Sequence, residues 1–493
     1  MRINLGVGVI PVGVGAALFA AGAAAGPLIA VGAVLGVALG AAIYAMPIIG
    51  LTLMVLAGTA LQILGSEHIS GLPVSLGKVA GALTLATWAA RSMLHRLPVT
   101  WSPQMLAQMA FLAAIFLSVV ASPGQEDAME GLTRYIQLIL LTLMIANIAG
   151  ESDRVLDQAC IGLTACMSLS SLIGLAEFLL PDLAIESDDP SLIQGSIGAI
   201  IDRDSLDGTE IKRITGGLSE SNWFAYTLVA VLPINLYLFF RFAGPVARLL
   251  ILSAATLQSI GIVLSFTRSA VIALAVSVLY LLIRKRIPLK PLLLAGFLVA
   301  GGFTLWNPAG LERLYSVQYA SEGSTPLRTY LFLGGVALVG ERPITGFGYN
   351  QYGPNFMHWL DTAADVPESV LQWQESVESR VATGEERLEW IMPHNTVVQV
   401  WVEFGLLGLL AFAGIVFFIF RDLSVARRFG DPPRQLLADC LVAALLGFLV
   451  CSMFGHLALA KMVWLLAGYA TALRRVAVES AATRLRTAPG VAR

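Results

Sequence analysis

The sequence predicts an all-α, polytopic membrane protein with about 12–14 transmembrane helices and one large loop that itself contains helices. Of its 493 residues, 57% are hydrophobic and 13% are charged, whereas soluble domains are about 25% charged. The apolar residues fall into runs of about 17 to 25, long enough to cross a bilayer core of about 30 Å as helices. Lysine and arginine also favour alternate connections between these runs, as they do in polytopic membrane proteins.

The apolar runs define fourteen candidate spans. Seven precede the first long polar segment, near residues 6–24, 27–44, 47–64, 76–94, 104–121, 130–149 and 156–180. Seven follow it, near residues 219–240, 247–266, 269–284, 290–306, 396–420, 436–454 and 457–474. Residues 6–25 imitate a signal sequence, but many equally apolar runs follow, so we interpret them as an uncleaved first span.

The charge pattern predicts the orientation. With a cytoplasmic N-terminus, the 31 Lys and Arg residues divide into 19 inside and 12 outside, and eight of the twelve lie in two long loops. Long loops do not count in the positive-inside rule, so both termini are predicted to be cytoplasmic. The predicted organisation is helices over 1–180, a first outer loop over 181–218, helices over 219–306, a large outer loop over 307–395, helices over 396–475 and a cytoplasmic tail over 476–493.

Both outer loops contain patterns of regular structure. In the first loop, residues 200–204 and 210–215 flank Asp207-Gly208, which predicts a hairpin because Asp-Gly suits a tight type I′ turn. In the large loop, residues 327–339 and 367–390 have helical spacing of apolar side chains, which predicts a pair of interfacial helices.

Three arginines are predicted to lie on the outer face. Arg268 stands at a turn between two spans, Arg213 precedes the span that opens at 219, and Arg328 begins the apolar stretch of the large loop. A guanidinium stays charged and can hold a phosphate through two hydrogen bonds, so such a cluster suits a lipid diphosphate. The alternatives are an interfacial arginine at position 268 and surface salt bridges at the other two positions.

A histidine and two polar residues complete the candidate site. His394 directly precedes a span, where an imidazole can remove a hydroxyl proton near neutral pH, although a lone interfacial histidine can also be incidental. Asn395 is placed as the N-cap of that span, and Glu403 lies within its apolar run. The histidines lack metal-ligand spacing and no nucleotide-binding loop is present. We expect no metal, no cofactor and no nucleic-acid partner.

Four segments together resemble the O-antigen ligase and Wzy-type polysaccharide polymerase superfamily. The first segment begins at Arg213-Ile-Thr-Gly-Gly, and the second is Ser265-Phe-Thr-Arg268. The third consists of Arg328 followed by Glu341 to Gly348, and the fourth of His394-Asn395 followed by Glu403-Phe-Gly405. Their order and spacing fit the family, and the resemblance covers about residues 213–415. Ser221 departs from the pattern, since the family often has proline there, so Asn222 is carried over only as a structural cap.

The resemblance implies a GT-C-like fold and a metal-independent, inverting glycosyltransferase at the periplasmic face of a bacterial inner membrane. It also implies an undecaprenyl-diphosphate-linked glycan donor, with Arg213, Arg268 and Arg328 binding the diphosphate, His394 activating the acceptor hydroxyl, and Asn395, Glu403 and Asn222 in support. The family's ligases have twelve spans, so the extra pair is expected near the N-terminus, as a real addition or a re-entrant segment.

The acceptor remains open between two enzymes. A polymerase would extend another lipid-linked glycan, with a chain-length regulator as a possible partner, whereas a ligase would glycosylate lipid A core or a protein. The large loop of about 90 residues favours the polymerase, since it can enclose a polymer. From another class, a lipid-linked oligosaccharide flippase would also have many spans, but transporters place charges near the bilayer midplane and have short loops.

Overall fold

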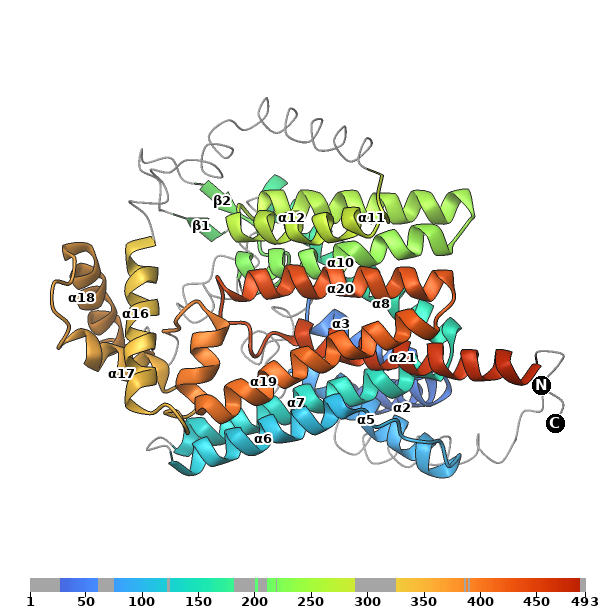
Figure 1. Ribbon diagram of the computed structural model, residues 1–493, viewed down its shortest axis with the longest axis horizontal. Helices are drawn as coiled ribbons and strands as arrows, with labels where there is room; N and C mark the ends of the chain where they lie inside the picture. Colours follow the sequence, from blue (N-terminus) through green and yellow to red (C-terminus); the bar gives the residue numbers. More distant parts are fainter. Residues whose placement is uncertain are drawn as a thin grey trace.

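The computed structural model describes residues 27–60, 75–121, 125–180, 200–202, 211–218, 220–288, 325–384, 387–388 and 391–487. This part of the chain forms a bundle of long helices that run in roughly the same direction, with short helices and a strand pair at one end (Figure 1). The prediction of an all-α polytopic membrane protein is confirmed. The predicted spans at 6–24 and 290–306 lie outside the described residues.

Within the described residues, seven helices are long and apolar enough to cross a membrane. They are α6 (Pro103–Ala121), α7 (Gln125–Ile148), α8 (Asp153–Leu179), α10 (Ser221–Arg241), α11 (Pro245–Leu264), α19 (Thr396–Phe429) and α20 (Pro432–Ser452). Three shorter or more polar helices also occupy predicted spans, α5 (Leu76–Leu94), α12 (Arg268–Ile283) and α21 (Lys461–Thr487). α21 continues well into the predicted cytoplasmic tail.

Local signals explain where several of these helices begin. Asn395 caps α19, since its side chain accepts hydrogen bonds from the amides of Val397 and Val398. Asp431 caps α20 in the same way, with a proline in the first turn, and Ser152 caps α8. Each cap satisfies amide groups that the first turn leaves without a helical partner. The predicted cap at Asn395 is therefore confirmed.

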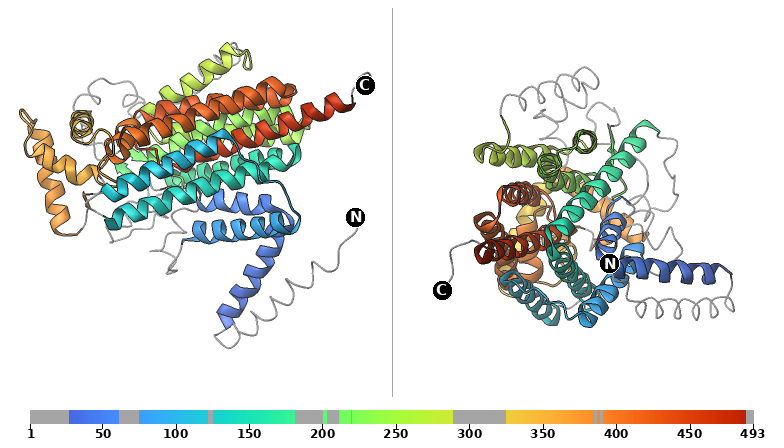
Figure 2. Two further views of the ribbon diagram at one scale, coloured as in Figure 1. Left: turned by 60° about the horizontal axis from the view of Figure 1, so that its bottom comes forward. Right: turned by 90° about the vertical axis from the view of Figure 1, so that its right-hand side faces the viewer.

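The N-terminal helices differ from the prediction of two separate spans. α2 (Pro27–Ala45) and α3 (Pro47–Ala57) meet at a break of one residue and are bent by 119°. The 11 residues of α3 are too few to cross a bilayer, so the pair is a broken span or a re-entrant segment. In the end-on view of Figure 2, α2 extends sideways from the bundle.

The described parts of both polar segments lie at one end of the bundle, which we call the loop end (Figure 1). Strands β1 (Ile200–Asp202) and β2 (Ile211–Arg213) pair antiparallel, with Ile200 opposite Arg213, so the predicted hairpin pairing is confirmed. The described part of the large loop holds three helices where two were predicted: α16 (Thr325–Glu341), α17 (Tyr352–Leu360) and α18 (Glu368–Ala382). They share a small core of their own.

The opposite end, which we call the tail end, is rich in ion pairs. Asp439 is fully buried and lies within 4 Å of three arginines, Arg284, Arg286 and Arg427. Asp157 pairs with Arg241, and Glu151 with Arg91. Buried carboxylates need such partners. The arginines from which the cytoplasmic side was predicted therefore also stabilise the packing of these helix ends.

Candidate active site

Arg213 joins its own strand to the next helix and to a turn more than 50 residues further along the chain. Its Nε donates to the carbonyl of Ser265 at 2.9 Å, and one terminal nitrogen donates to Asn222 Oδ1 at 2.8 Å and to Thr267 Oγ1 at 3.2 Å. The strand that carries Arg213 is thereby attached to the first turn of α10 and to the turn between α11 and α12. Two of the four resemblance segments, the one from Arg213 to Asn222 and the one from Ser265 to Arg268, therefore meet at one guanidinium.

Asn222 is not the helix cap that the sequence suggested. α10 begins at Ser221 and its capping position is Glu220, while the Asn222 side chain points to Arg213 and Thr267. The Arg213 guanidinium and the Thr267 hydroxyl both donate to the Asn222 side-chain oxygen, which therefore does not accept from the amides of its own helix. Its role is to hold the Arg213 guanidinium in place.

A buried glutamate that the sequence analysis did not select shapes the turn after Arg213. Glu177, near the end of α8, accepts hydrogen bonds from the amides of Thr215, Gly216 and Gly217 at 2.9, 3.1 and 3.3 Å. Both glycines have positive φ, of 60° and 83°, which other residues rarely adopt. The signal in the sequence was an acidic residue inside an apolar span.

Arg268 is the first residue of α12 and is half-buried. The preceding turn contains Phe266, a non-glycine residue with a φ of 50°, and such backbone conformations often occur at functional sites. The following residue, Ser269, is hydrogen-bonded to the Tyr226 hydroxyl of α10 at 2.7 Å. These contacts fix the start of α12 beside α10.

His394 lies in a turn that is fastened to the loop between α20 and α21. Thr396 Oγ1 donates to the carbonyl of Gly455 at 2.7 Å and accepts from the amide of Leu457 at 2.8 Å. The Asn395 side chain donates to the carbonyl of Met453 at 3.3 Å. His394 itself has a φ of 48°, a second left-handed, non-glycine residue at this end of the bundle.

These contacts bring a second histidine next to His394. The rings of His394 and His456 are in edge-to-face contact with centroids 5.4 Å apart, and His456 also contacts Trp223 at 5.7 Å. The Nδ1 of His456 is buried and has no hydrogen-bond partner among the described residues. His456 was not among the predicted site residues, although its place between the predicted spans 436–454 and 457–474 already assigned it to the outer face.

Arg328 lies in the first turn of α16, half-buried. Its positive charge lies close enough to His394 and Tyr226 to act on both, so the large loop brings a third arginine into the neighbourhood of this cluster. Burial, the neighbouring His456 and the Arg328 charge together lower the pKa of His394 to about 3. The imidazole is therefore neutral at physiological pH, and the same surroundings make it a weaker base than a free imidazole.

Glu403 lies apart from this cluster. It is nine residues beyond His394 on α19, about 13 Å along the helix axis, and is fully buried. Its carboxyl group approaches Gln399 and the amide of Asn350 without a hydrogen bond of standard geometry. Its backbone carbonyl accepts hydrogen bonds from Ser118 Oγ at 2.6 Å and from the amide of Gly348 at 2.9 Å.

The segment around Glu403 has a structural explanation. α19 is broken at Gly405, where φ is 66° and ψ is −171°. The segment that follows α16 fills this break, with the amide of Phe347 bonded to the carbonyl of Val402 at 2.8 Å and the amide of Leu406 bonded to the carbonyl of Pro343 at 2.8 Å. The later parts of two resemblance segments, residues 341–348 and 403–405, therefore pack against each other and support the large loop. The first residues of the same two segments, Arg328 and His394, lie in the cluster instead.

The loop end thus assembles a defined group of side chains, which we call the Arg–His cluster: Arg213, Arg268, Arg328, His394 and His456. Arg213 is hydrogen-bonded to Ser265 and Thr267, in the turn directly before Arg268. The rings of His394 and His456 are in contact, and the charge of Arg328 acts on His394. Fixed cations next to a neutral imidazole can stabilise negative charge on a leaving group while a proton is removed from a nucleophile.

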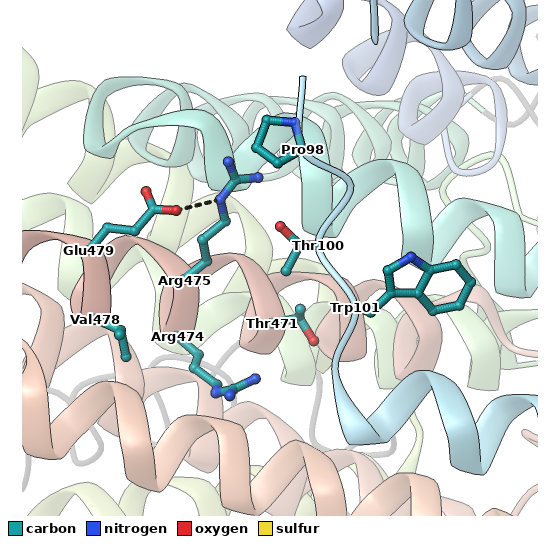
Figure 3. A pocket seen from close by; sticks show the side chains of 8 residues that line it. All are labelled: Pro98, Thr100, Trp101, Thr471, Arg474, Arg475, Val478 and Glu479. Atoms are coloured by element: carbon teal, nitrogen blue, oxygen red, sulfur yellow. Dashed lines mark hydrogen bonds and ion pairs between the residues drawn. The ribbon is translucent and has the colours of Figure 1, made fainter. Parts of the chain in front are cut away.

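A separate pocket lies elsewhere in the described part of the chain. It lies on the last helix, α21, near the segment between α5 and α6, towards the tail end (Figure 3). Its lining shares no residue with the Arg–His cluster.

One comparison with known proteins matches part of the chain that carries the cluster. The model of a family described as O-Antigen ligase matches residues 249–413. This region contains Arg268, Arg328, His394 and Glu403, whereas Arg213, Asn222 and His456 lie outside it. No curated protein matches the sequence.

Proposed function

From the premise that residues 249–413 belong to the O-antigen ligase-related superfamily, we propose that this membrane protein transfers a lipid-linked glycan to an acceptor hydroxyl at the periplasmic face of a bacterial inner membrane. The observation that carries the proposal is the geometry of the loop end, where His394 is in ring contact with His456 and Arg213 is hydrogen-bonded to the turn before Arg268. A polytopic chain with its polar helices gathered at that end supports a reaction at the membrane surface.

The donor is a glycan on undecaprenyl diphosphate, and the arginines bind the diphosphate. Arg213 uses Nε and one terminal nitrogen to hold its position, which keeps the guanidinium fixed before substrate binds. Preorganised cations cost little reorganisation as charge develops on a departing group. The diphosphate also supplies its own leaving-group energy, so the reaction needs no nucleotide and, in this proposal, no metal ion or other cofactor.

His394 acts as the general base. The acceptor hydroxyl attacks the anomeric carbon of the donor sugar, its oxygen forms the new glycosidic bond, and its proton passes to His394. The bond from that carbon to the diphosphate oxygen breaks on the opposite side, so the configuration inverts. The arginines stabilise the undecaprenyl diphosphate that leaves with the bonding electrons.

We assign the acceptor as a second lipid-linked glycan, which makes the protein a Wzy-type polymerase of O-antigen or exopolysaccharide. The three helices α16, α17 and α18 form a folded wall with its own core at the loop end, and such a wall suits a growing polymer. The alternative is a ligase that transfers the glycan to lipid A core or to a protein, which the family's description favours.

The assigned roles are tested by transfer assays on purified protein. His394→Ala should lower the rate about 10²–10⁴-fold, the range for loss of a general base, and Arg268→Ala should lower it by a similar amount. His358→Ala is the matched control, because His358 is an exposed histidine on α17. Transfer at the wild-type rate by either site variant would refute these roles.

Product analysis separates the acceptors. With a defined lipid-linked donor alone, a polymerase gives a ladder of longer lipid-linked products, whereas a ligase needs labelled lipid A core or a protein to give any product. If neither product forms and liposomes show the donor crossing the bilayer, the protein is a flippase and the proposal is wrong.

A further inference from the structure

The pocket of about 240 Å³ towards the tail end carries an inference of its own. One wall is a face of α21 that presents Thr471, Arg474, Arg475 and Glu479, and the other is the segment from Pro98 to Trp101 that leads into α6 (Figure 3). Two adjacent arginines in one concave site are the usual recognition element for a phosphate group.

Both arginines keep hydrogen-bonding capacity. Arg475 donates through Nε to Glu479 at 2.9 Å, and the Nε of Arg474 lies 3.6 Å from Asp422, beyond hydrogen-bond distance. Among the described residues, the terminal nitrogens of these two side chains have no hydrogen-bond partner. A guanidinium has five N–H donors, so most of the donors of the pair remain available to an anion.

The walls of the pocket are held in place before any ligand binds. The amide of Thr100 donates to Asn147 Oδ1 at 2.7 Å, which attaches the segment between α5 and α6 to α7. Thr471 Oγ1 lies 3.1 Å from Gln104 and 3.1 Å from Asp422, which joins α21 to α6 and α19. A preformed site loses little entropy when it binds its ligand.

Exposed apolar side chains surround the pocket. Trp101 is 65% exposed and Val478 is 40% exposed, and both line it. Val99 and Leu94 on the adjoining segment are 41% and 72% exposed. Tryptophan beside arginine is typical of the interface between headgroups and acyl chains, and this arrangement suits a ligand with both a phosphate and hydrocarbon chains.

We propose that this pocket binds the phosphate headgroup of an anionic phospholipid of the inner leaflet. Arg474 and Arg475 bind the phosphate, and Trp101, Val99 and Val478 contact the first part of the acyl chains. The charge pattern of the sequence predicts that this end faces the cytoplasm, where such lipids attract basic clusters. The site is separate from the Arg–His cluster, and the proposal does not depend on the reaction.

The test measures lipid bound to the full-length protein in nanodiscs of phosphatidylcholine with or without phosphatidylglycerol. Native mass spectrometry should find phosphatidylglycerol retained by the wild type, and Arg474→Gln/Arg475→Gln should reduce the retained fraction about tenfold. Arg475→Gln alone is a milder variant, because it keeps Arg474 next to Asp422. Arg486→Gln is the matched control, because it removes the same charge from an exposed position of the same helix.

Each outcome decides the question. Loss in the double and single variants with retention in Arg486→Gln supports the site. Equal retention in all variants, or equal loss in the control, would overturn it. Displacement of the lipid by inorganic phosphate would assign the pocket to a soluble phosphate compound and overturn the lipid. Circular dichroism at matched temperature identifies a double variant that has not folded, in which case Arg475→Gln alone decides.

Discussion

His394 combines features that the sequence presents separately. It follows a proline, precedes a capping asparagine, adopts a left-handed backbone conformation and faces both His456 and Arg328. Burial and these two neighbours disfavour its charged form, so the imidazole is neutral before substrate binds. The negative charge of a bound diphosphate beside it would raise its proton affinity in the proposed reaction. A position that looked incidental in the sequence is a constrained one in the fold.

The low pKa of His394 has a consequence for stability. Its pKa is about 3 in the folded protein against about 6.5 in an unfolded chain, so the unfolded state binds the proton first. Stability should therefore fall as pH falls from about 6.5 towards 3. Between about pH 7.5 and pH 5, we expect the wild type in detergent to lose about 1–2 kcal/mol more than His394→Gln. Equal losses in denaturant titrations would contradict this.

His456 is expected to act as a positioning residue through its ring. His456→Phe retains a ring between Trp223 and His394, whereas His456→Ala leaves a space beside the base. We expect the alanine variant to lower kcat about tenfold with little change in KM, because a displaced base loses orientation, and the phenylalanine variant to recover most of the rate. If the two variants have the same kcat, the ring contact has no such role.

At the scale of elements, α19 depends on a break. Its first two turns support the turn that holds His394, and the remainder crosses the bundle after a change of direction at Gly405 (Figure 1). A helix with this break leaves backbone groups without helical partners, and the segment from Pro343 to Gly348 satisfies some of them. The geometry of the loop end thus rests on one glycine and on the segment that packs against it.

Gly405→Ala should be destabilising. A Cβ at this position would overlap the carbonyl of Ile344, and the positive φ strains any side chain. We expect a loss of about 1–3 kcal/mol and lower transfer activity. Gly414→Ala on the same helix is the control, because its Cβ would make an ordinary 3.6 Å contact with Ala107. Unfolding and activity assays that rank the two variants equally would show that the break is not needed.

At the scale of the whole molecule, the two ends of the bundle have different chemistry. The loop end carries the Arg–His cluster and the helices of the large loop, while the tail end carries arginines paired with buried carboxylates. This asymmetry supports the orientation that the positive-inside rule predicts. It also separates the proposed reaction from the proposed lipid site by the length of the bundle.

The orientation is tested with single cysteines. The four natural cysteines are buried and free, so they give a low background for thiol labelling. Ser379→Cys, exposed on α18, should react with a membrane-impermeant maleimide added to spheroplasts, whereas Ala482→Cys, exposed on α21, should react only after the membrane is opened. The reverse pattern would invert the topology and place the Arg–His cluster in the cytoplasm.

The sequence by itself determined the spans and which residues gather at one end. The predicted spans at 76–94, 104–121 and 247–266 coincide within two residues with α5, α6 and α11, because the length of an apolar run decides where a helix can cross a bilayer. The alternation of inner and outer connections between the spans likewise predicted that Arg213, Arg268, Arg328 and His394 lie on the same side of the membrane.

Only the tertiary structure decided which of these residues are partners. The hydrogen bond from Arg213 to Asn222, the cradle that Glu177 forms, the contact between His394 and His456 and the break at Gly405 all join segments distant in the chain or depend on them. Periodicity and hydropathy describe one segment at a time, whereas side-chain hydrogen bonds and ring contacts depend on how helices pack together.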